Sequence, residues 1–192
     1  IVEATEGMET DDVAYVLRSL PNDLSREVLS QMDTVDRFRV ETALSYPEDT
    51  AGGMMNTDFI TIRADVEIDV VLRYLRMKGE LPEATDALYV LDEESRLIGH
   101  LSLTTILTAQ PDVLVSDVMD DADEAIPVNT DDGEVANLFE RRNWISAPVV
   151  DENNLLLGRI TIDDVVDVIR EDAEHSMMSM AGMDDEEDTF AP

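Results

Sequence analysis

The sequence predicts an α+β fold in which a short all-α segment precedes two copies of a β-α-β-β-α unit. Two observations predict this fold. Between residues 10 and 46, apolar residues recur at helical spacing in three short segments. From residue 54 to 173 the chain repeats itself, and each copy alternates strand-like with helix-like segments. Neither copy is large enough to bury much apolar surface alone, so the copies are expected to pack together.

The all-α segment is interpreted as the end of a helical domain. A first helix is expected from an N-cap at Thr10 to Pro21, a second from about residue 25, and a third from about residue 34 to Pro47. The segment Y-P-E-D-T-A-G-G-M-M follows at 46–55, where a pair of glycines permits a sharp change of direction. This segment is expected to form an interdomain hinge.

The repeat is clearest in two hairpins. L-Y-V-L-D-E-E-S-R-L-I-G-H-L-S-L at 88–103 aligns without a gap with A-P-V-V-D-E-N-N-L-L-L-G-R-I-T-I at 147–162, so that Gly99 matches Gly158. Polar turns link the two strands of each hairpin. The expected strands are 59–62, 87–91 and 97–102 in the first copy and 125–128, 147–150 and 155–160 in the second. The expected helices before the hairpins are 68–77 and 134–142, and a further helix closes each copy.

The helix that closes the second copy has two different faces. At 100° per residue, four carboxylates fall within about 80° of one another on one side. We call Asp164, Asp167, Glu171 and Glu174 the acidic ridge. The opposite side, expected to pack on the core, carries Val165, Val166, Val168, Ile169 and Ala173. The ridge residues repel one another unless cations or salt screen them.

Composition narrows the possible functions. The chain has 192 residues, a net charge of -32 and no cysteine. The lack of clustered basic residues argues against nucleic acid as a partner, and a surface this acidic suits a salt-rich cytoplasm, which suggests a halophilic source. No paired nucleophile, Gly-rich phosphate loop or His-carboxylate cluster suggests an enzyme. General acidity explains any single carboxylate, so only the ridge as a group favours a cation site.

Two sequence patterns resemble a known family. A-P-V-V-D followed by G-R-I-T-I-D-D at 147–164 resembles the hallmark of cystathionine-β-synthase (CBS) domains, a P-V-V-D hairpin followed by G-h-h-T-x-x-D with h apolar. Arg159 departs from that pattern at an apolar position. The preceding helices, the Y-P-E-D-T-A-G-G-M-M segment and the acidic run after Thr161 look similar to the cytosolic part of the MgtE family of magnesium channels and transporters. The resemblance covers nearly all of residues 10–183.

The resemblance implies a regulatory, non-enzymatic homodimer that senses Mg²⁺ at the cytoplasmic face of the cell membrane, below a transmembrane pore domain. The family's acidic sensor positions fall on Asp11, Asp131, Asp164, Asp167 and Asp172. Other acidic positions of the family are here Tyr15, Gly133, Asn143 and His175. Sites lost there could be rebuilt from Asp12, Asp132, Glu171 and Glu174. Mg²⁺ prefers carboxylate and water ligands and usually keeps several waters.

The alternative is a CBS pair that senses ATP or AMP. In the CBS pattern the threonine contacts phosphate and the following aspartate holds the ribose, which points to Thr161 and Asp164, with Ser102 in the first copy. Trp144 or Tyr89 could form an aromatic wall, and Arg159 could assist. Thr161 could equally cap the helix, and few basic residues are available for phosphate. The expected domain limits are 1–46, a hinge at 47–53, 54–111, 112–173, and a connecting helix with an acidic tail at 174–192.

Overall fold

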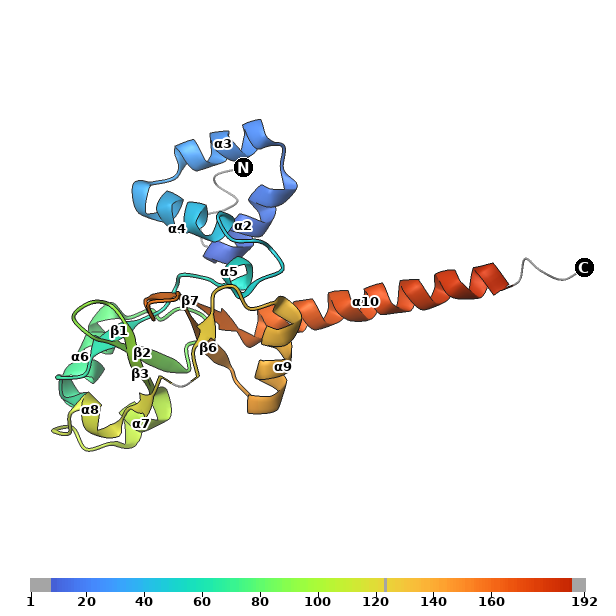
Figure 1. Cartoon of the computed structure of the whole chain (residues 1–192). Coiled ribbons are helices and arrows are strands. Elements are labelled where there is room, and N and C mark those ends of the chain that lie inside the picture. Colours follow the sequence, from blue (N-terminus) through green and yellow to red (C-terminus); the bar gives the residue numbers. More distant parts are fainter. Residues whose placement is uncertain (1–7, 123, 188–192) are drawn as a thin grey trace, which may run out of the picture.

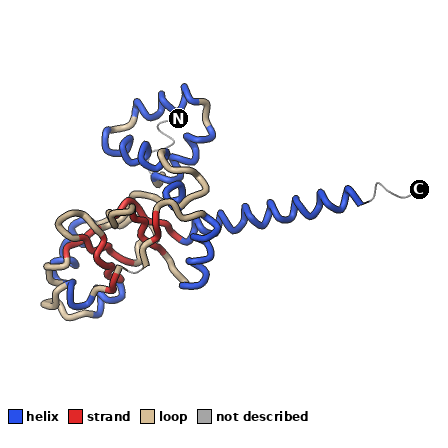
Figure 2. Tube along the Cα trace, viewed as in Figure 1, coloured by secondary structure: helices blue, strands red, loops and turns tan. Residues whose placement is uncertain are grey.

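The computed structural model of the chain describes residues 8–122 and 124–187. A layer of three helices lies above two small β-sheets, and one long helix, α10 (Ile162–Glu187), projects away from them (Figure 1). Figure 2 shows the strands gathered together with helices around them. The predicted α+β class, a helical segment before two β-α-β-β-α units, is confirmed.

The helical layer consists of α2 (Thr10–Ser19), α3 (Asn22–Gln31) and α4 (Thr34–Leu44). Its small core is formed by Val13, Leu17, Val28 and Val40. The expected N-cap at Thr10 is wrong, because the extended residue before the first helical turn is Glu9. Thr10 is instead buried, and its hydroxyl lies 3.0 Å from the hydroxyl of Thr57, which ties the layer to the rest of the chain.

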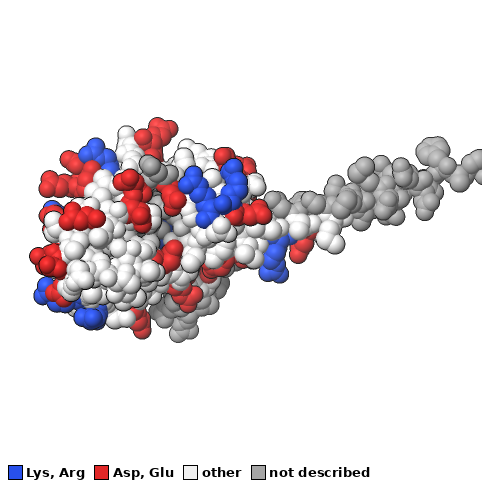
Figure 3. Space-filling view, turned by 90° about the horizontal axis from the view of Figure 1, so that it is seen from below, with Lys and Arg blue, Asp and Glu red and all other residues white. Residues whose placement is uncertain are grey.

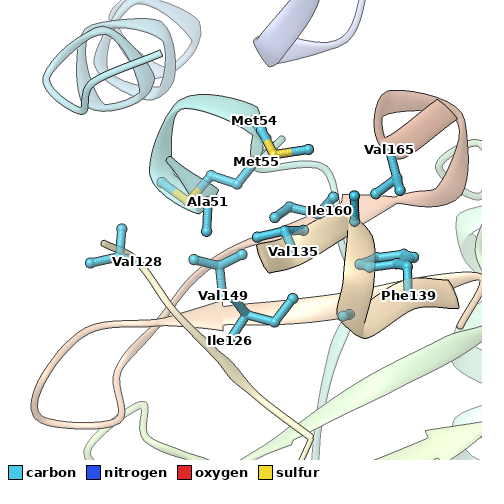
Figure 4. Close-up of a cluster of buried hydrophobic side chains, with 12 residues drawn as sticks. Ala51, Met54, Met55, Ile126, Val128, Val135, Phe139, Val149, Ile160 and Val165 are labelled. Carbon is cyan, nitrogen blue, oxygen red and sulfur yellow. The ribbon is translucent and has the colours of Figure 1, made fainter. Parts of the chain in front are cut away.

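The segment 47–53, expected to be a hinge, contains a short helix. Residues Ala51–Met54 form the short helix α5, and all four are buried. Figure 4 shows Ala51, Met54 and Met55 packed in one cluster with Val135 and Ile160 of the second unit. The glycines serve close packing, since a Cβ at Gly52 would lie 2.5 Å from the ring of Tyr46. The second half of the expected hinge is therefore packed in the core of the second unit, while residues 47–49 before it are exposed.

The two units have matching sheets. In the first sheet the strands lie side by side in the order β1 (Thr61–Arg63), β2 (Ala87–Leu91), β3 (Leu97–Ser102) and β4 (Asp120–Asp121). The second contains β5 (Ile126–Pro127), β6 (Ser146–Val150) and β7 (Leu156–Thr161). In both, a parallel pair is followed by an antiparallel hairpin. Val90 pairs with Gly99 and Val149 with Gly158, each beside a bulge, so the two hairpins keep the same register.

Helices close both units. The first has α6 (Ile68–Lys78), α7 (Leu103–Thr108) and α8 (Val115–Val118), and the second has α9 (Asp132–Arg142) and α10. On α10 the expected core face is only partly correct. Val165 is buried, whereas Val166 is 45% and Ile169 49% exposed, because the helix contacts the second unit along a narrow strip. No helix among the described residues is long and apolar enough to cross a membrane.

The face of the molecule that Figure 3 shows carries acidic side chains spread over it, with fewer basic side chains between them. Because these charges repel one another in the compact state, we expect the free energy of unfolding to rise as KCl is raised from low to molar concentration. The melting temperature should rise by several degrees, at about 2–4 °C for each kcal/mol. Sucrose at matched osmolality is the control. If sucrose raised the melting temperature as much as KCl does, screening of the surface charges would not be the cause.

Candidate acidic metal site

A cavity of about 810 Å³ lies between the helical layer and the second unit. Helix α2 forms one wall, α10 forms the facing wall, and residues before α5 and at the start of α9 close the sides. Its lining carboxylates are Asp11, Asp12, Glu48, Asp49, Asp132, Asp164, Asp167, Glu171 and Glu174. Two arginines, Arg18 and Arg170, also line it. The cavity therefore has a strong excess of negative charge.

The acidic ridge of α10 faces this cavity as a group. All four of its residues are among the lining residues, as the helical spacing predicts. Of the two arginines, Arg170 lies 3.6 Å from Asp167, and Arg18 donates to the backbone carbonyls of Ala43 and Tyr46. Much of the ridge charge is therefore left to be balanced by solvent or by a bound cation.

Asp11 on α2 and Asp164 on α10 face each other across the cavity. Their carboxyl groups are within hydrogen-bonding reach of each other, and Asp11 Oδ1 is buried without a donor. Burial, followed by the charge of Asp164, raises the pKa of Asp11 to about 8. Burial and the charge of Asp163 raise the pKa of Asp164. The hydroxyl of Thr161 donates to Asp164 Oδ2 at 3.0 Å and holds that carboxyl in place.

A third carboxyl, Glu9, lies at the edge of the same cluster. Burial raises the pKa of Glu9 to about 7, against the lowering effect of Arg159, whose Nη2 lies 4.0 Å from Glu9 Oε1. Asn56 donates its side-chain amide to Glu9 Oε2 at 3.3 Å. The carboxyls that join the layer to the second unit are thus held where full ionisation is unfavourable.

The remaining predicted metal ligands are placed differently. Asp131 is exposed and caps α9 by accepting from the amide of Gly133, while Asp132 beside it lines the cavity. Asp172 lies in α10, but its side chain is outside those the structure describes, as is the predicted acidic tail after residue 187.

Sequence reasoning missed Glu48 and Asp49, which line the cavity from the segment interpreted as a hinge. The backbone carbonyl of Asp49 accepts from the amide of Asp132, so the two segments meet beside the site. No local pattern marks this long-range pairing.

The donor set fits a hard divalent cation. Carboxylate oxygens from two separate elements converge, and the buried Asp11 oxygen has no donor to satisfy it. Among the described residues no group of three or more His, Cys, Asp or Glu side chains is placed to hold a metal ion. A cation held here would therefore keep water molecules, as Mg²⁺ usually does.

The residues predicted to bind a nucleotide do not lie together. Thr161 and Asp164 bond to each other, and Asp164 lines the acidic cavity. Ser102 caps α7 by accepting from the amide of Thr105. The expectation that Arg159 assists a nucleotide is wrong, because its side chain is 2% exposed and donates to the backbone carbonyls of Asp58, Glu83 and Ala84.

Trp144 and Tyr89 line a separate cavity of about 170 Å³ where the two units meet. The first unit contributes the start of β2 and His100 of β3, and the second contributes residues 143–148. This cavity, which we call the inter-unit pocket, is defined by Asp86, Ala87, Tyr89, His100, Glu124, Asn143, Trp144, Ile145, Ser146, Ala147 and Pro148. The aromatic wall predicted from Trp144 and Tyr89 lies in this pocket.

Comparison with known proteins gives consistent matches. Residues 1–49 match the MgtE intracellular N domain, and residues 51–112 and 115–171 match the CBS domain. The magnesium transporter MgtE of Thermus thermophilus is 32% identical over 184 residues, which cover 96% of this chain and 39% of the relative. MgtE of Bacillus subtilis is 33% identical over 190 residues, 98% of this chain and 42% of the relative. This chain thus spans about two fifths of these relatives.

A solved structure matches over most of the chain. The crystal structure of the cytosolic domain of the Mg²⁺ channel MgtE in complex with ATP has 34% sequence identity and a TM-score of 0.83. The match covers 87% of this chain and 68% of that one.

Proposed function

This chain, an MgtE N domain followed by two CBS domains, belongs to the MgtE family, and from that premise we propose that it senses Mg²⁺ and regulates a magnesium transporter. The observation that carries the proposal is the pairing of Asp11 with Asp164 across the acidic cavity. The proposed role is regulatory and not catalytic. It places the chain at the cytoplasmic face of the membrane, joined to a pore domain.

In this proposal Asp11 and Asp164 would hold the ion, water would complete its coordination, and the rest of the cavity lining would attract cations. The bound charge offsets repulsion between the walls, so α2 and α10 stay together when Mg²⁺ is abundant. Without it, the ionised carboxylates of the two helices push the helical layer away from the second unit. The equilibrium between docked and undocked layers then depends on Mg²⁺, because only the docked form brings both carboxylates together.

The long helix α10 extends from the cavity wall and would carry this change towards the proposed pore domain. We also propose a homodimer. Ile162, Val166 and Ile169 form an apolar row on α10, and each is more than a third exposed. A second copy packed on this row would remove it from water.

The proposal predicts that millimolar Mg²⁺ compacts the protein and slows proteolysis of residues 46–53 severalfold, in buffer with ample KCl. Small-angle scattering gives the radius of gyration and the mass, which should be that of two chains. Ionic strength is held constant with KCl, so that general screening is the same with and without Mg²⁺. Scattering and cleavage that do not change with Mg²⁺, while AMP or ATP stabilises the protein, would favour the second function below.

The second candidate function is binding of an adenine nucleotide in the inter-unit pocket. Its support is the aromatic lining of that pocket by Trp144 and Tyr89, together with the ATP bound by the similar MgtE cytosolic domain. Because the pocket does not share lining residues with the acidic cavity, the two functions are compatible. We propose residues 1–46 as the helical domain. We propose a boundary between the two CBS units after β4 and not at residue 111, because Val115 packs in the first core and β4 pairs with β3. Ala51, Met54 and Met55 pack into the second CBS unit.

A further inference from the structure

Two arginines stand among the nine carboxylates that line the acidic cavity in the described part of the chain, and the two are held differently. Arg18 on α2 donates from Nη2 to the carbonyl oxygens of Ala43, at 3.1 Å, and Tyr46, at 2.9 Å. These carbonyls lie at and just after the C-terminal end of α4, where the helix dipole favours a cation. The guanidinium of Arg18 is therefore fixed within the helical layer.

Arg170, on the facing wall, is held by an exposed ion pair. Its Nη1 lies 3.6 Å from Asp167 Oδ1, and both side chains are 72% exposed. An exposed pair contributes little to stability, because solvent screens the two charges and ordering two long side chains costs entropy. The guanidinium of Arg170 can therefore leave Asp167 at low cost and move along the wall that α10 forms.

The place of Arg170 on the helix puts its charge beside the acidic ridge. At 100° per residue it lies about 60° from Asp167 and about 40° from Glu174, so it borders the ridge on one side. It follows Asp167 by three residues and precedes Glu174 by four, the two spacings at which side chains on a helix meet. Arg170 can therefore balance either carboxylate while it remains in the cavity lining.

We propose that Arg170 is a tethered counterion of the acidic cavity, which offsets part of the repulsion between α2 and α10 in the metal-free protein and opposes the entry of a divalent cation. This inference rests on the proposed function and concerns the regulation of the same site. The guanidinium and a bound Mg²⁺ repel each other, so Arg170 raises the Mg²⁺ concentration at which the cavity fills. Across roughly 8 Å in a water-like medium, one positive charge lowers the affinity for a divalent ion by roughly fivefold at low salt.

The test uses the whole chain at low KCl. Calorimetric titration with Mg²⁺ measures the affinity, and proteolysis of residues 46–53 without Mg²⁺ measures how often the helical layer leaves the second unit. Arg170→Gln removes the charge, so it should bind Mg²⁺ roughly three- to fivefold more tightly, and without Mg²⁺ it should be cleaved faster than the wild type. Arg170→Lys keeps the charge and should match the wild type in both measurements. Molar KCl should reduce both effects.

Arg141→Gln is the matched control, because it removes the same charge from an exposed arginine of α9 that is not among the residues lining the cavity. It should leave the affinity and the cleavage rate unchanged. If the wild type binds Mg²⁺ and Arg170→Gln binds it equally well or more weakly, the inference is overturned while the proposed function stands. The inference also fails if Arg170→Lys behaves like Arg170→Gln, since charge would not be the cause. If the wild type does not bind Mg²⁺, both are overturned.

Discussion

Asp164→Asn is expected to stabilise the metal-free protein at pH 8 and to remove most of its response to Mg²⁺. An asparagine at this position can still accept from Thr161, and its amide can donate to Asp11 Oδ1, the buried oxygen that has no donor in the wild type. One of two facing carboxylates becomes neutral, so the repulsion that opposes docking of α2 on α10 falls. The same change removes one of the two ligands proposed to hold the ion.

The pH dependence of the wild type follows from the raised pKa of Asp11, about 8 against an ordinary 3.8. Between these values the folded protein holds a proton that the unfolded chain releases. The resulting contribution to stability is complete below about pH 4 and is lost as pH rises through about 8. Mg²⁺ competes with this proton, so its effect should be larger at pH 8 than at pH 6.

Urea unfolding at pH 5 and pH 8, with and without Mg²⁺ at constant ionic strength, measures both effects. The wild type should lose stability between the two pH values and regain it with Mg²⁺, while Asp164→Asn should respond weakly to both. Asp112→Asn removes one charge at an exposed loop of the first unit and serves as the matched control. The proposed role of the Asp11–Asp164 pair is contradicted if Asp164→Asn keeps the full Mg²⁺ response. It is also contradicted if Asp164→Asn is less stable than the metal-free wild type at pH 8.

The repeat and the helix periodicity account for what could be predicted from sequence. The gapless alignment of the two hairpins places Gly99 and Gly158 at the same position of each sheet, and the structure has that register. The spacing of Asp164 to Glu174 predicts a common face because rotation along a helix is a local property. Such features depend on residues close together in the chain.

Features that depend on long-range contacts could not be predicted. Gly52 and Gly53 suggest a turn by composition, but the buried environment around α5 selects helix. Glu48 and Asp49 reach the acidic cavity only because their segment pairs with the start of α9. In the sequence, Arg159 stands at an apolar position of the CBS pattern and suggests a cation that could assist a nucleotide. It is buried because three carbonyls from distant loops surround it.

Arg159→Met is expected to lower the free energy of unfolding by about 3–5 kcal/mol, the usual effect of removing one partner from a buried charged network. Arg159 joins three parts of the chain. It donates to Asp58 in the segment before β1 and to Glu83 and Ala84 in the loop before β2, and it lies 4.0 Å from Glu9 before α2. A methionine fills similar space but leaves those carbonyls without donors and Glu9 without its cation. Urea unfolding measures the loss.

Two further variants separate charge from geometry. Arg159→Lys keeps the positive charge beside Glu9, but one ammonium cannot reproduce the planar guanidinium that serves three carbonyls, so it should recover only part of the stability. Arg76→Met, on the exposed side of α6, should change stability by less than about 0.5 kcal/mol. If Arg159→Lys had the full stability of the wild type, the hydrogen bonds to the three carbonyls would not be needed. The positive charge opposite Glu9 would then be what holds the helical layer and the two CBS units together.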